Sequence, residues 1–308
     1  MPEPLITARS LAKNFGDFKA VDSIDFDVYR NESFGLLGPN GAGKSTTMRI
    51  IGATSQRSSG EISILGMDPE KHGPEIRAYL GVVPQKDNLD EQLTVTENLY
   101  IYGRYFGLSK KFISKKIDEL LDFAQLEEKR DAKVESLSGG MKRRLTIARA
   151  LVSEPEILML DEPTTGLDPQ ARHILWDRLF RLKERGVTLV ITTHFMDEAE
   201  QLCERLIVLD RGKIMAEGSP IELIKQYSTK EVLELRFGSE RNEEIAPTLK
   251  DSCDRLEVLP DRILMYSDDA EHSLEVIMRQ GLHPRTSLVR RSSLEDVFLR
   301  LTGRSLVE

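Results

Sequence analysis

The sequence contains little cysteine. Of its 308 residues only Cys203 and Cys253 are cysteines, too few for a disulfide framework, and we expect a reducing cytosol. Cys203 follows Ala199 and Leu202 at helical spacing. This spacing favours a small buried apolar side chain over a nucleophile or a metal ligand.

Long apolar runs and a secretion signal are also missing. The longest apolar stretches, such as 157–160 and 187–191, fall far below the roughly 18 residues that a membrane-spanning helix needs. The N-terminus lacks the basic start and the apolar stretch of a secretion signal. We therefore expect no membrane-spanning segment.

Positive charge is in deficit. The 43 Lys and Arg residues against 51 Asp and Glu residues give a formal net charge of −8, the wrong sign for a protein that holds a polyanionic backbone over a broad surface. Nucleic acid is therefore not expected as a partner. The hydrophobic content of 40% suffices for a substantial core, and the length suggests one large and one small domain.

The first predicted domain, residues 1–219, has an α/β pattern. β-rich runs, glycine turns and amphipathic helices alternate, as in a mostly parallel sheet flanked by helices. A helical subdomain is expected at about 90–150, where Thr94 and Glu97 form a capping box. Short β-like runs predict a small antiparallel layer beside the sheet: 5–9, 24–28 and 62–65.

The second predicted domain, residues 220–308, has a β-α-β-β-α-β order, which indicates a small α+β, ferredoxin-like sandwich. Its expected elements are strands 231–237, 255–259, 262–266 and 285–290 and helices 242–250 and 271–280. A last helix is predicted to start at Ser292, with Glu295 as its capping partner.

That last helix carries an apolar stripe at positions i, i+3, i+4 and i+7, formed by Leu294, Val297, Phe298 and Leu301. Such a stripe must be covered. Packing within its own domain is favoured, and packing between two copies of the domain stays open.

A phosphate-binding loop follows the short apolar strand 33–37. The motif G-x-x-x-x-G-K-S comprises Gly38, Pro39, Asn40, Gly41, Ala42, Gly43, Lys44 and Ser45, and a helix continues from Thr46. Backbone N–H groups and the helix N-terminus would face phosphate, Lys44 would bind the β and γ oxygens, and the Ser45 hydroxyl could ligate Mg²⁺. A plain glycine turn is the weaker interpretation, because lysine and serine stand at the required positions.

Two carboxylates end the apolar strand 157–160. Asp161 is expected to hold the metal, and Glu162 to polarise the attacking water as a general base. A solvated acidic pair is the alternative. A second glycine-rich helix start follows Leu137, with Ser138, Gly139 and Gly140 as a further anion-binding terminus.

The order of these motifs resembles that of the ABC transporter ATPases, over residues 5 to about 219. The resemblance implies that Phe15 stacks on adenine and that Gln85 touches Mg²⁺ and senses a membrane partner. It also implies that Asp168 belongs to the D-loop and that His194 is the switch histidine that contacts the γ-phosphate. In this family the cap at Ser138, Gly139 and Gly140 meets the ATP of a second subunit.

One position departs from the family pattern, since Met141 stands where the signature usually has glutamine. Within that family the chain further resembles the nodulation-factor (lipooligosaccharide) export ATPases and their daunorubicin-exporter relatives. This resemblance is carried by segments 87–90, 102–106, 137–145 and 294–304. The neighbouring basic run Lys142-Arg143-Arg144 is predicted to be a solvated helix face rather than a contact with phosphate or a partner.

The resemblance implies an ATP-hydrolysing subunit of an ABC-2-type exporter of a hydrophobic or amphiphilic cargo, with ATP and Mg²⁺ as cofactors. It further implies a homodimer bound peripherally to the cytoplasmic face of the inner membrane. A separate integral-membrane permease would dock near Gln85 and the helical subdomain. The alternatives are a non-transport ABC ATPase that acts on a soluble partner, and a module that binds without catalysis.

Overall fold

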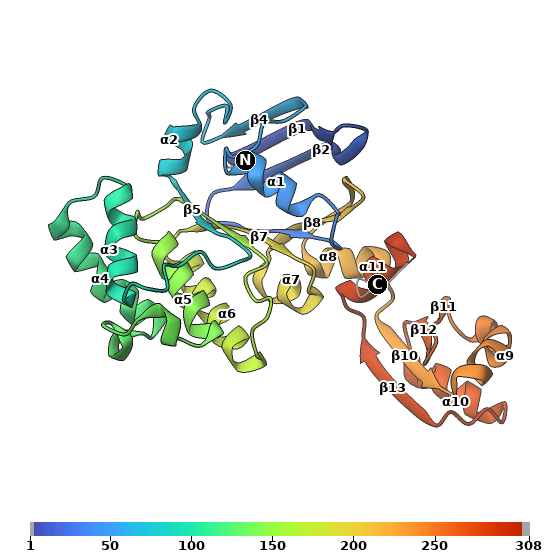
Figure 1. Cartoon of the computed structure of the whole chain (residues 1–308). Helices are drawn as coiled ribbons and strands as arrows, with labels where there is room; N and C mark the ends of the chain where they lie inside the picture. The colour runs from blue at the N-terminus through green and yellow to red at the C-terminus, as the bar shows by residue number, and fades with distance from the viewer. Residues whose placement is uncertain (1–2, 304–308) are drawn as a thin grey trace. The chain divides into compact units, whose positions relative to one another are not determined.

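The computed structural model describes residues 3–303 (Figure 1). The chain divides into an N-terminal unit that ends at Glu217 and a C-terminal unit that begins at Gly218. The predicted boundary was residue 219. No helix within the described residues has the length and apolar character needed to cross a membrane.

A six-stranded sheet with the order β5-β6-β7-β3-β8-β9 forms the centre of the N-terminal unit. Its first five strands pair in parallel, as the apolar runs between helices predict. The strands are β3 (Ser33–Leu37), β5 (Leu80–Val83), β6 (Ile157–Asp161), β7 (Thr188–Thr193), β8 (Arg205–Asp210) and β9 (Lys213–Gly218). The carboxyl ends of β3, β6 and β7 therefore meet at one edge.

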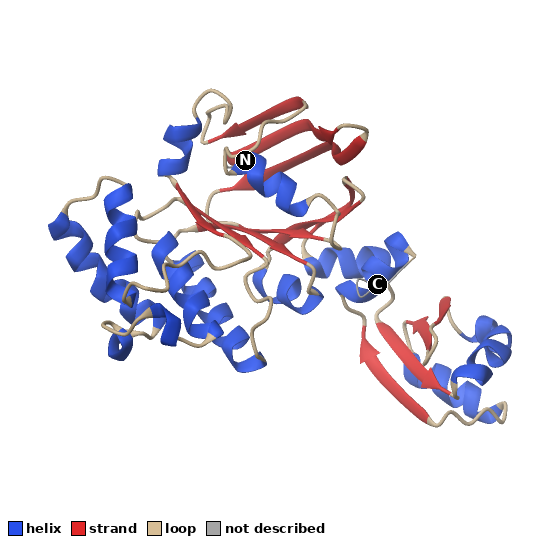
Figure 2. Cartoon of the chain, viewed as in Figure 1, coloured by secondary structure: helices blue, strands red, loops and turns tan. Residues whose placement is uncertain are grey.

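An antiparallel sheet of order β2-β1-β4 lies beside it, which confirms the predicted antiparallel layer. Its strands are β1 (Pro4–Phe15), β2 (Phe18–Tyr29) and β4 (Ser59–Ile64). Helix α1 (Lys44–Ile51) packs against β2 on one side and against β6 and β7 on the other. Figure 2 shows the two sheets and the helices around them. One apolar core joins both sheets to α1 through residues such as Ile6, Phe34 and Ile50.

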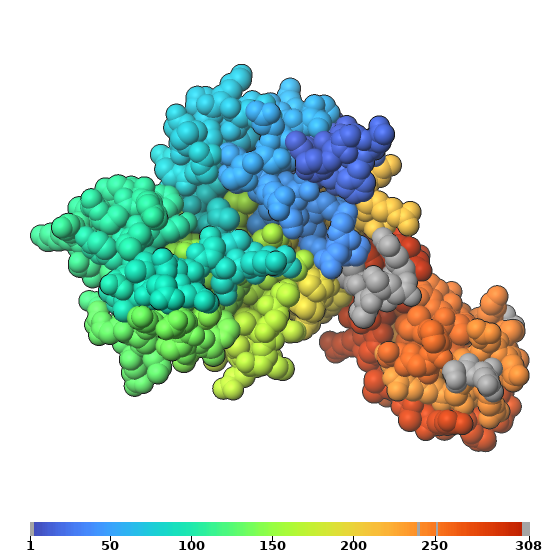
Figure 3. All heavy atoms as spheres, viewed as in Figure 1, coloured from blue at the N-terminus to red at the C-terminus, as the bar shows by residue number. Residues whose placement is uncertain are grey.

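The helical subdomain is inserted between β5 and β6, and it appears as the green lobe in Figure 3. Its helices are α3 (Val95–Tyr105), α4 (Lys110–Ala124) and α5 (Gly139–Ala150), with short 3₁₀ turns at Glu127–Lys129 and Val134–Ser136. The predicted capping box of Thr94 and Glu97 is present. The remaining helices of the unit are α2 (Gly73–Ala78), α6 (Pro169–Glu184) and α7 (Met196–Leu202).

The C-terminal unit contains an antiparallel sheet of order β11-β12-β10-β13, the arrangement of a ferredoxin-like sandwich. Helices α9 and α10 cover one face through Ile245, Leu249 and Ile277. The elements are α8 (Pro220–Tyr227), β10 (Glu231–Arg236), α9 (Ser239–Leu249), β11 (Arg255–Val258), β12 (Ile263–Ser267), α10 (Ala270–Arg279), β13 (Thr286–Arg291) and α11 (Leu294–Thr302).

The predicted cap of the last helix is wrong by one residue. Ser293 is the N-cap of α11, and Asp296 completes the capping box. Asp296 also accepts hydrogen bonds from Arg290 at 2.7 and 2.9 Å and from the Tyr266 hydroxyl at 3.1 Å. These tertiary partners favour Ser293 and Asp296 over the pair Ser292 and Glu295.

The apolar stripe of α11 is covered within its own unit. Leu294, Val297 and Phe298 are at most 1% exposed, and α11 packs against α8. Leu299 packs on the face of the sheet that α9 and α10 leave open. The contact of α11 with α8 supports packing of the stripe within its own domain, although Leu301, its fourth member, is only half-buried.

We predict that Phe298→Ala destabilises the C-terminal unit by about 3–5 kcal/mol, because it leaves a cavity beneath α11. Nucleotide affinity should not change, since the phosphate loop lies in the other unit. Calorimetric unfolding of the full chain measures the first effect, and titration with a fluorescent ATP analogue measures the second. Glu295→Ala, an exposed change on the same helix, is the control. An unchanged unfolding profile for Phe298→Ala would contradict the assignment.

Candidate active site

The phosphate loop connects the fully buried strand β3 to α1. Gly41 and Gly43 have φ angles of +81° and +106°, a region that side chains rarely adopt. A Cβ atom at Gly43 would lie 2.5 Å from the carbonyl oxygen of Ala20, so no larger residue fits. The loop can therefore turn its backbone N–H groups toward an anion.

Lys44 is 4% exposed and lies inside this loop. Its Nζ donates to the carbonyl oxygens of Gly38 at 2.7 Å and Pro39 at 3.0 Å, and it lies 3.5 Å from Oε1 of Glu162. Burial lowers the pKa of the Lys44 ammonium, and the attraction of Glu162 acts in the opposite direction. A phosphate beside Nζ would supply the opposite charge that this buried cation needs.

Glu162 is the point at which the predicted catalytic residues meet. Its carboxylate accepts a hydrogen bond from Nε2 of Gln85 at 2.7 Å, and Oε1 lies 3.3 Å from Nδ1 of His194. That nitrogen has no aligned hydrogen bond. With Lys44, three side chains from three segments surround one carboxylate that is 6% exposed.

The turn at Glu162 has a φ of +46°. Its backbone N–H donates to the carbonyl oxygen of Thr192 at 3.0 Å and to Oγ1 of the same residue at 3.1 Å. The Thr192 hydroxyl also donates to Oδ1 of Asp161 at 2.5 Å, and the Ser45 hydroxyl donates to that oxygen at 3.3 Å. Ser45 and Asp161 thus present hard oxygen ligands side by side.

A cavity of about 170 Å³ opens at the phosphate loop. Its lining contains Phe18, whereas Phe15 is 55% exposed and lies outside it, at the position paired with Phe18 across the hairpin. The other lining residues are Ala20, Pro39, Asn40, Gly41, Gly43, Lys44, Ser45, Thr46, Gln85 and Glu162. Phe18 was not predicted, and only the hairpin register distinguishes it from Phe15.

The predicted residues of the second glycine cap lie outside that cavity. Ser138 is the N-cap of α5, and its hydroxyl accepts a hydrogen bond from the N–H of Met141 at 3.3 Å. Methionine in place of the usual glutamine therefore leaves this cap intact. A Cβ atom at Gly139 would meet nothing within 4 Å, whereas one at Gly140 would lie 3.1 Å from Cβ of Ala171. Gly139 therefore faces open space.

Asp168 caps α6, where Oδ1 accepts from the N–H of Ala171 at 2.9 Å. This contact gives the side chain a structural function in the described chain. It lies outside the phosphate-loop cavity, as do Ser138 and Gly139.

The prediction of a solvated face for the basic run of α5 is wrong for Arg143, whose side chain is buried. It donates to carbonyl oxygens beside Glu162 and beside Gln85. Lys142 and Arg144 form exposed contacts instead, with Glu91 and Gln125. The sequence gives no signal that separates Arg143 from its neighbours.

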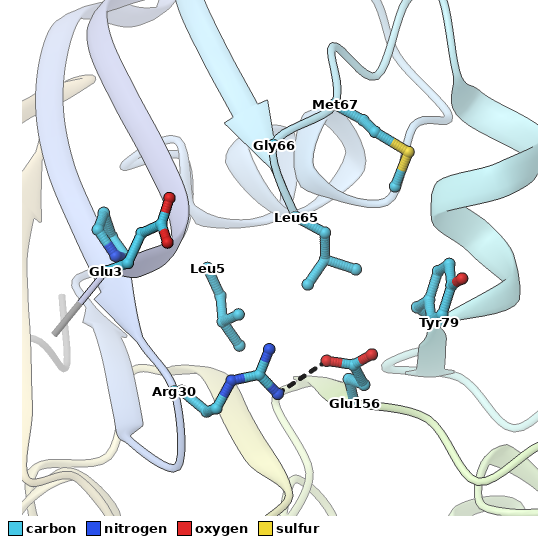
Figure 4. Close-up of a pocket in the computed structure, with 9 residues that line it drawn as sticks. Glu3, Leu5, Arg30, Leu65, Gly66, Met67, Tyr79 and Glu156 are labelled. Carbon is cyan, nitrogen blue, oxygen red and sulfur yellow. Dashed lines mark hydrogen bonds and ion pairs between the residues drawn. The ribbon is translucent and has the colours of Figure 1, made fainter.

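A separate cavity of about 420 Å³ contains none of the predicted site residues (Figure 4). Its charged pair, Arg30 and Glu156, is joined by a 2.8 Å hydrogen bond. The other labelled residues are Glu3, Leu5, Leu65, Gly66, Met67 and Tyr79. The Arg30 guanidinium is thus paired with a carboxylate of the same cavity.

Glu198, on α7 just after His194, is fully buried. Burial raises the pKa of its carboxyl group, and the nearby Thr193 and Thr164 hydroxyls and the Trp176 indole only partly oppose this. At a pH between the pKa of this carboxyl group in the unfolded chain and its raised pKa in the folded chain, the folded state binds more protons than the unfolded state does. The stability that this group contributes is therefore fully present below its pKa in the unfolded chain, and it is lost as the pH rises through its pKa in the folded chain.

We predict that Glu198→Gln raises the melting temperature at pH 8 by about 2–4 °C, the change that about 1 kcal/mol produces in a domain of this size. The difference should shrink toward pH 5, where the wild-type carboxyl is increasingly protonated in both states. Thermal melts across this range measure it, and the exposed change Glu184→Gln is the control. A variant that is less stable than wild type at every pH would refute the prediction.

Comparisons with known proteins agree with this geometry. The sequence profile described as ABC transporter matches residues 21–165. A solved structure described as an ATP-binding subunit of an ABC transporter has a TM-score of 0.66 at 30% identity and covers 72% of this chain and 93% of its own. A dimeric ATP-binding cassette with bound ADP and phosphate has a TM-score of 0.63 at 30% identity, covering 70% and 98%. The fold and the site define an ATP-binding cassette of the ABC transporter class.

The full length of the chain has close relatives. The Nod factor export ATP-binding protein I of Rhizobium sp. (strain N33) is 47% identical over 99% of each chain, and that of Cupriavidus metallidurans is 45% identical over 98% of each. The profile of the nodulation factor export protein NodI C-terminal domain matches residues 240–303. The chain belongs to the family of Nod factor export ATP-binding proteins.

Proposed function

We propose that this chain is the ATP-hydrolysing subunit of an ABC-2-type exporter that moves an amphiphilic lipooligosaccharide through a separate permease. The observation that carries this proposal is the convergence of Lys44, Gln85 and His194 on the Glu162 carboxylate beside the phosphate loop. A loop that only bound nucleotide would not require a buried carboxylate with these partners. The relatives' name, Nod factor export, supports the cargo class.

Glu162 is the proposed general base, and His194 the proposed contact of the γ-phosphate. Lys44 would bind the β and γ oxygens. Ser45 and Asp161 fit Mg²⁺, because a hydroxyl and a carboxylate oxygen lie 3.3 Å apart and hard oxygen ligands suit this ion. When bound, Mg²⁺ would neutralise developing phosphate charge, and Gln85 would contact it from the neighbouring loop.

A homodimer is the proposed working form. The chain carries one phosphate loop and one signature cap, and the cap at Ser138 and Gly139 lies outside the phosphate-loop cavity of its own chain. Open space in front of Gly139 is consistent with an ATP held by a second copy. Pairing of this kind would give two composite ATP sites. The solved dimeric cassette supports this proposal.

The permease would dock, peripherally at the cytoplasmic face of the inner membrane, in a groove of about 500 Å³ next to Gln85. We call it the Q-loop groove. Its floor is apolar, with Met48, Val83 and Met159, and its rim carries exposed basic and apolar side chains. The rim residues are Arg49, Arg77, Val82 and Lys86. A permease segment with apolar and acidic side chains would fit this lining.

A non-transport ABC ATPase is the alternative function, and the relatives argue against it. Their full-length similarity includes the C-terminal unit, and their names specify export. Nothing in the described site favours a soluble partner over a permease.

Replacing the proposed base tests the catalytic function. Glu162→Gln should lower kcat by about a hundredfold to ten-thousandfold, because the amide keeps the shape but cannot take a proton. ATP affinity should be retained, and an ATP-bound dimer should accumulate in size-exclusion chromatography. Lys44→Ala is the matched control that should lose nucleotide binding. A monomeric Glu162→Gln protein that hydrolyses ATP at the wild-type rate would refute the proposal.

A negative charge introduced in the Q-loop groove tests permease docking. Val82 is 42% exposed on the edge strand β5, so Val82→Glu should fold and hydrolyse ATP normally. It should lose at least tenfold in recovery with the solubilised membrane fraction, since about 1.4 kcal/mol of interface energy gives this factor. Ile221→Glu, an exposed change in the C-terminal unit, is the control. Equal recovery of both variants would place docking elsewhere.

A further inference from the structure

The Arg143 guanidinium lies between two loops of the active site. It comes from α5, the helix that begins at the signature cap, and it is 4% exposed. On one side Nε donates to the carbonyl oxygen of Pro163 at 2.8 Å, and Nη2 donates to those of Asp161 at 3.1 Å and Glu162 at 3.3 Å. Three consecutive carbonyl groups of the turn at the end of β6 thus face one side chain.

On its other side the same guanidinium binds the loop that carries Gln85. Nη1 donates to the carbonyl oxygen of Pro84 at 2.5 Å and to that of Gln85 at 3.5 Å, and it lies 3.4 Å from Oδ1 of Asp87. Two more contacts join α5 to this loop. The Thr146 hydroxyl donates to Asp87 at 3.1 Å, and Arg149 donates to the carbonyl oxygen of Asn88 at 2.9 Å.

The chemistry of this contact requires arginine. A guanidinium has five N–H donors in a rigid plane, whereas a lysine ammonium has three donors on a flexible stem. The acceptors around Arg143 are mostly backbone carbonyl groups, so the contact fixes main-chain positions. Arg144, the next residue, instead donates to Oε1 of Gln125 at 2.8 Å in the helical subdomain.

We propose that Arg143 is a positioning residue that holds the Glu162 turn and the Gln85 loop against the signature helix, so that Gln85 and Glu162 meet in one geometry. The proposal rests on the proposed function, in which Glu162 is the base and Ser138 and Gly139 cap the partner's ATP. Because Arg143 and Ser138 belong to the same helix, a displacement of the Gln85 loop moves the signature cap as well.

Matched lysine substitutions test the effect on turnover. Arg143→Lys should lower kcat about tenfold to a hundredfold, since a misplacement of about 1 Å costs up to that factor, while KM and ATP affinity stay within about twofold. Arg144→Lys should keep the wild-type kcat. A wild-type kcat in Arg143→Lys would overturn the proposal, and so would equal losses in both variants.

A double-mutant cycle with Glu162→Gln separates positioning from a general structural defect. If Arg143 acts through Glu162, adding Arg143→Lys to Glu162→Gln should slow single-turnover hydrolysis less than twofold further. Full additivity of the two losses would show that Arg143 acts independently of the base. If Glu162→Gln alone left hydrolysis unchanged, the proposed function would fail.

Hydrogen exchange tests the geometry without any turnover, and so independently of the proposed function. Amide exchange in peptides that cover 84–90 and 161–165 should rise severalfold in Arg143→Lys and stay at the wild-type rate in Arg144→Lys. Arg143→Gln, which keeps two N–H donors without charge, replaces the lysine variant if that variant does not fold. Faster exchange in only one of the two segments, or in neither, would overturn the proposal.

Discussion

The backbone turn at Glu162 is the constraint on which the site depends. A φ of +46° is unfavourable for a residue with a side chain, so the turn must be held by its surroundings. Thr192 binds its N–H group from β7, and Arg143 binds its carbonyl group from α5. Only with the turn held on both sides does one carboxylate reach Lys44 and Gln85 together.

The sequence predicts those parts of the site whose chemistry is local. The residues of the phosphate loop are contiguous in the sequence, and the positive φ angles at Gly41 and Gly43 require glycine there. Asp161 and Glu162 follow a buried strand, which assigns them to the sheet edge. Arg143 could not be predicted, because its partners are carbonyl groups of distant loops. Every residue has a backbone carbonyl group, so a sequence pattern does not show which of them an arginine contacts.

In the C-terminal unit, too, the sequence pattern predicts the order of the elements, whereas tertiary contacts determine the details. Alternating apolar residues and turns suffice for the β-α-β-β-α-β order, which the sheet order confirms. Two overlapping capping boxes are possible at the last helix, and Arg290 and Tyr266 select Asp296 by binding its carboxylate. Leu299, which lies on α11 beside the stripe, packs with Val232, Leu264 and Tyr266. The periodicity of the helix alone does not specify those partners.

The contacts of Lys44 connect the occupancy of the site to its catalytic state. Lys44 is held by two loop carbonyl groups and lies 3.5 Å from Glu162, and burial lowers the pKa of its ammonium. A phosphate anion is a stronger partner for a buried cation than a carbonyl oxygen is, so its arrival draws Nζ toward the nucleotide. The Glu162 carboxylate, 3.5 Å from Nζ in the described chain, would then lose one of its cationic neighbours. Gln85 and the turn held by Arg143 would keep that carboxylate in place, so the proposed base stays beside the phosphate loop when a nucleotide binds.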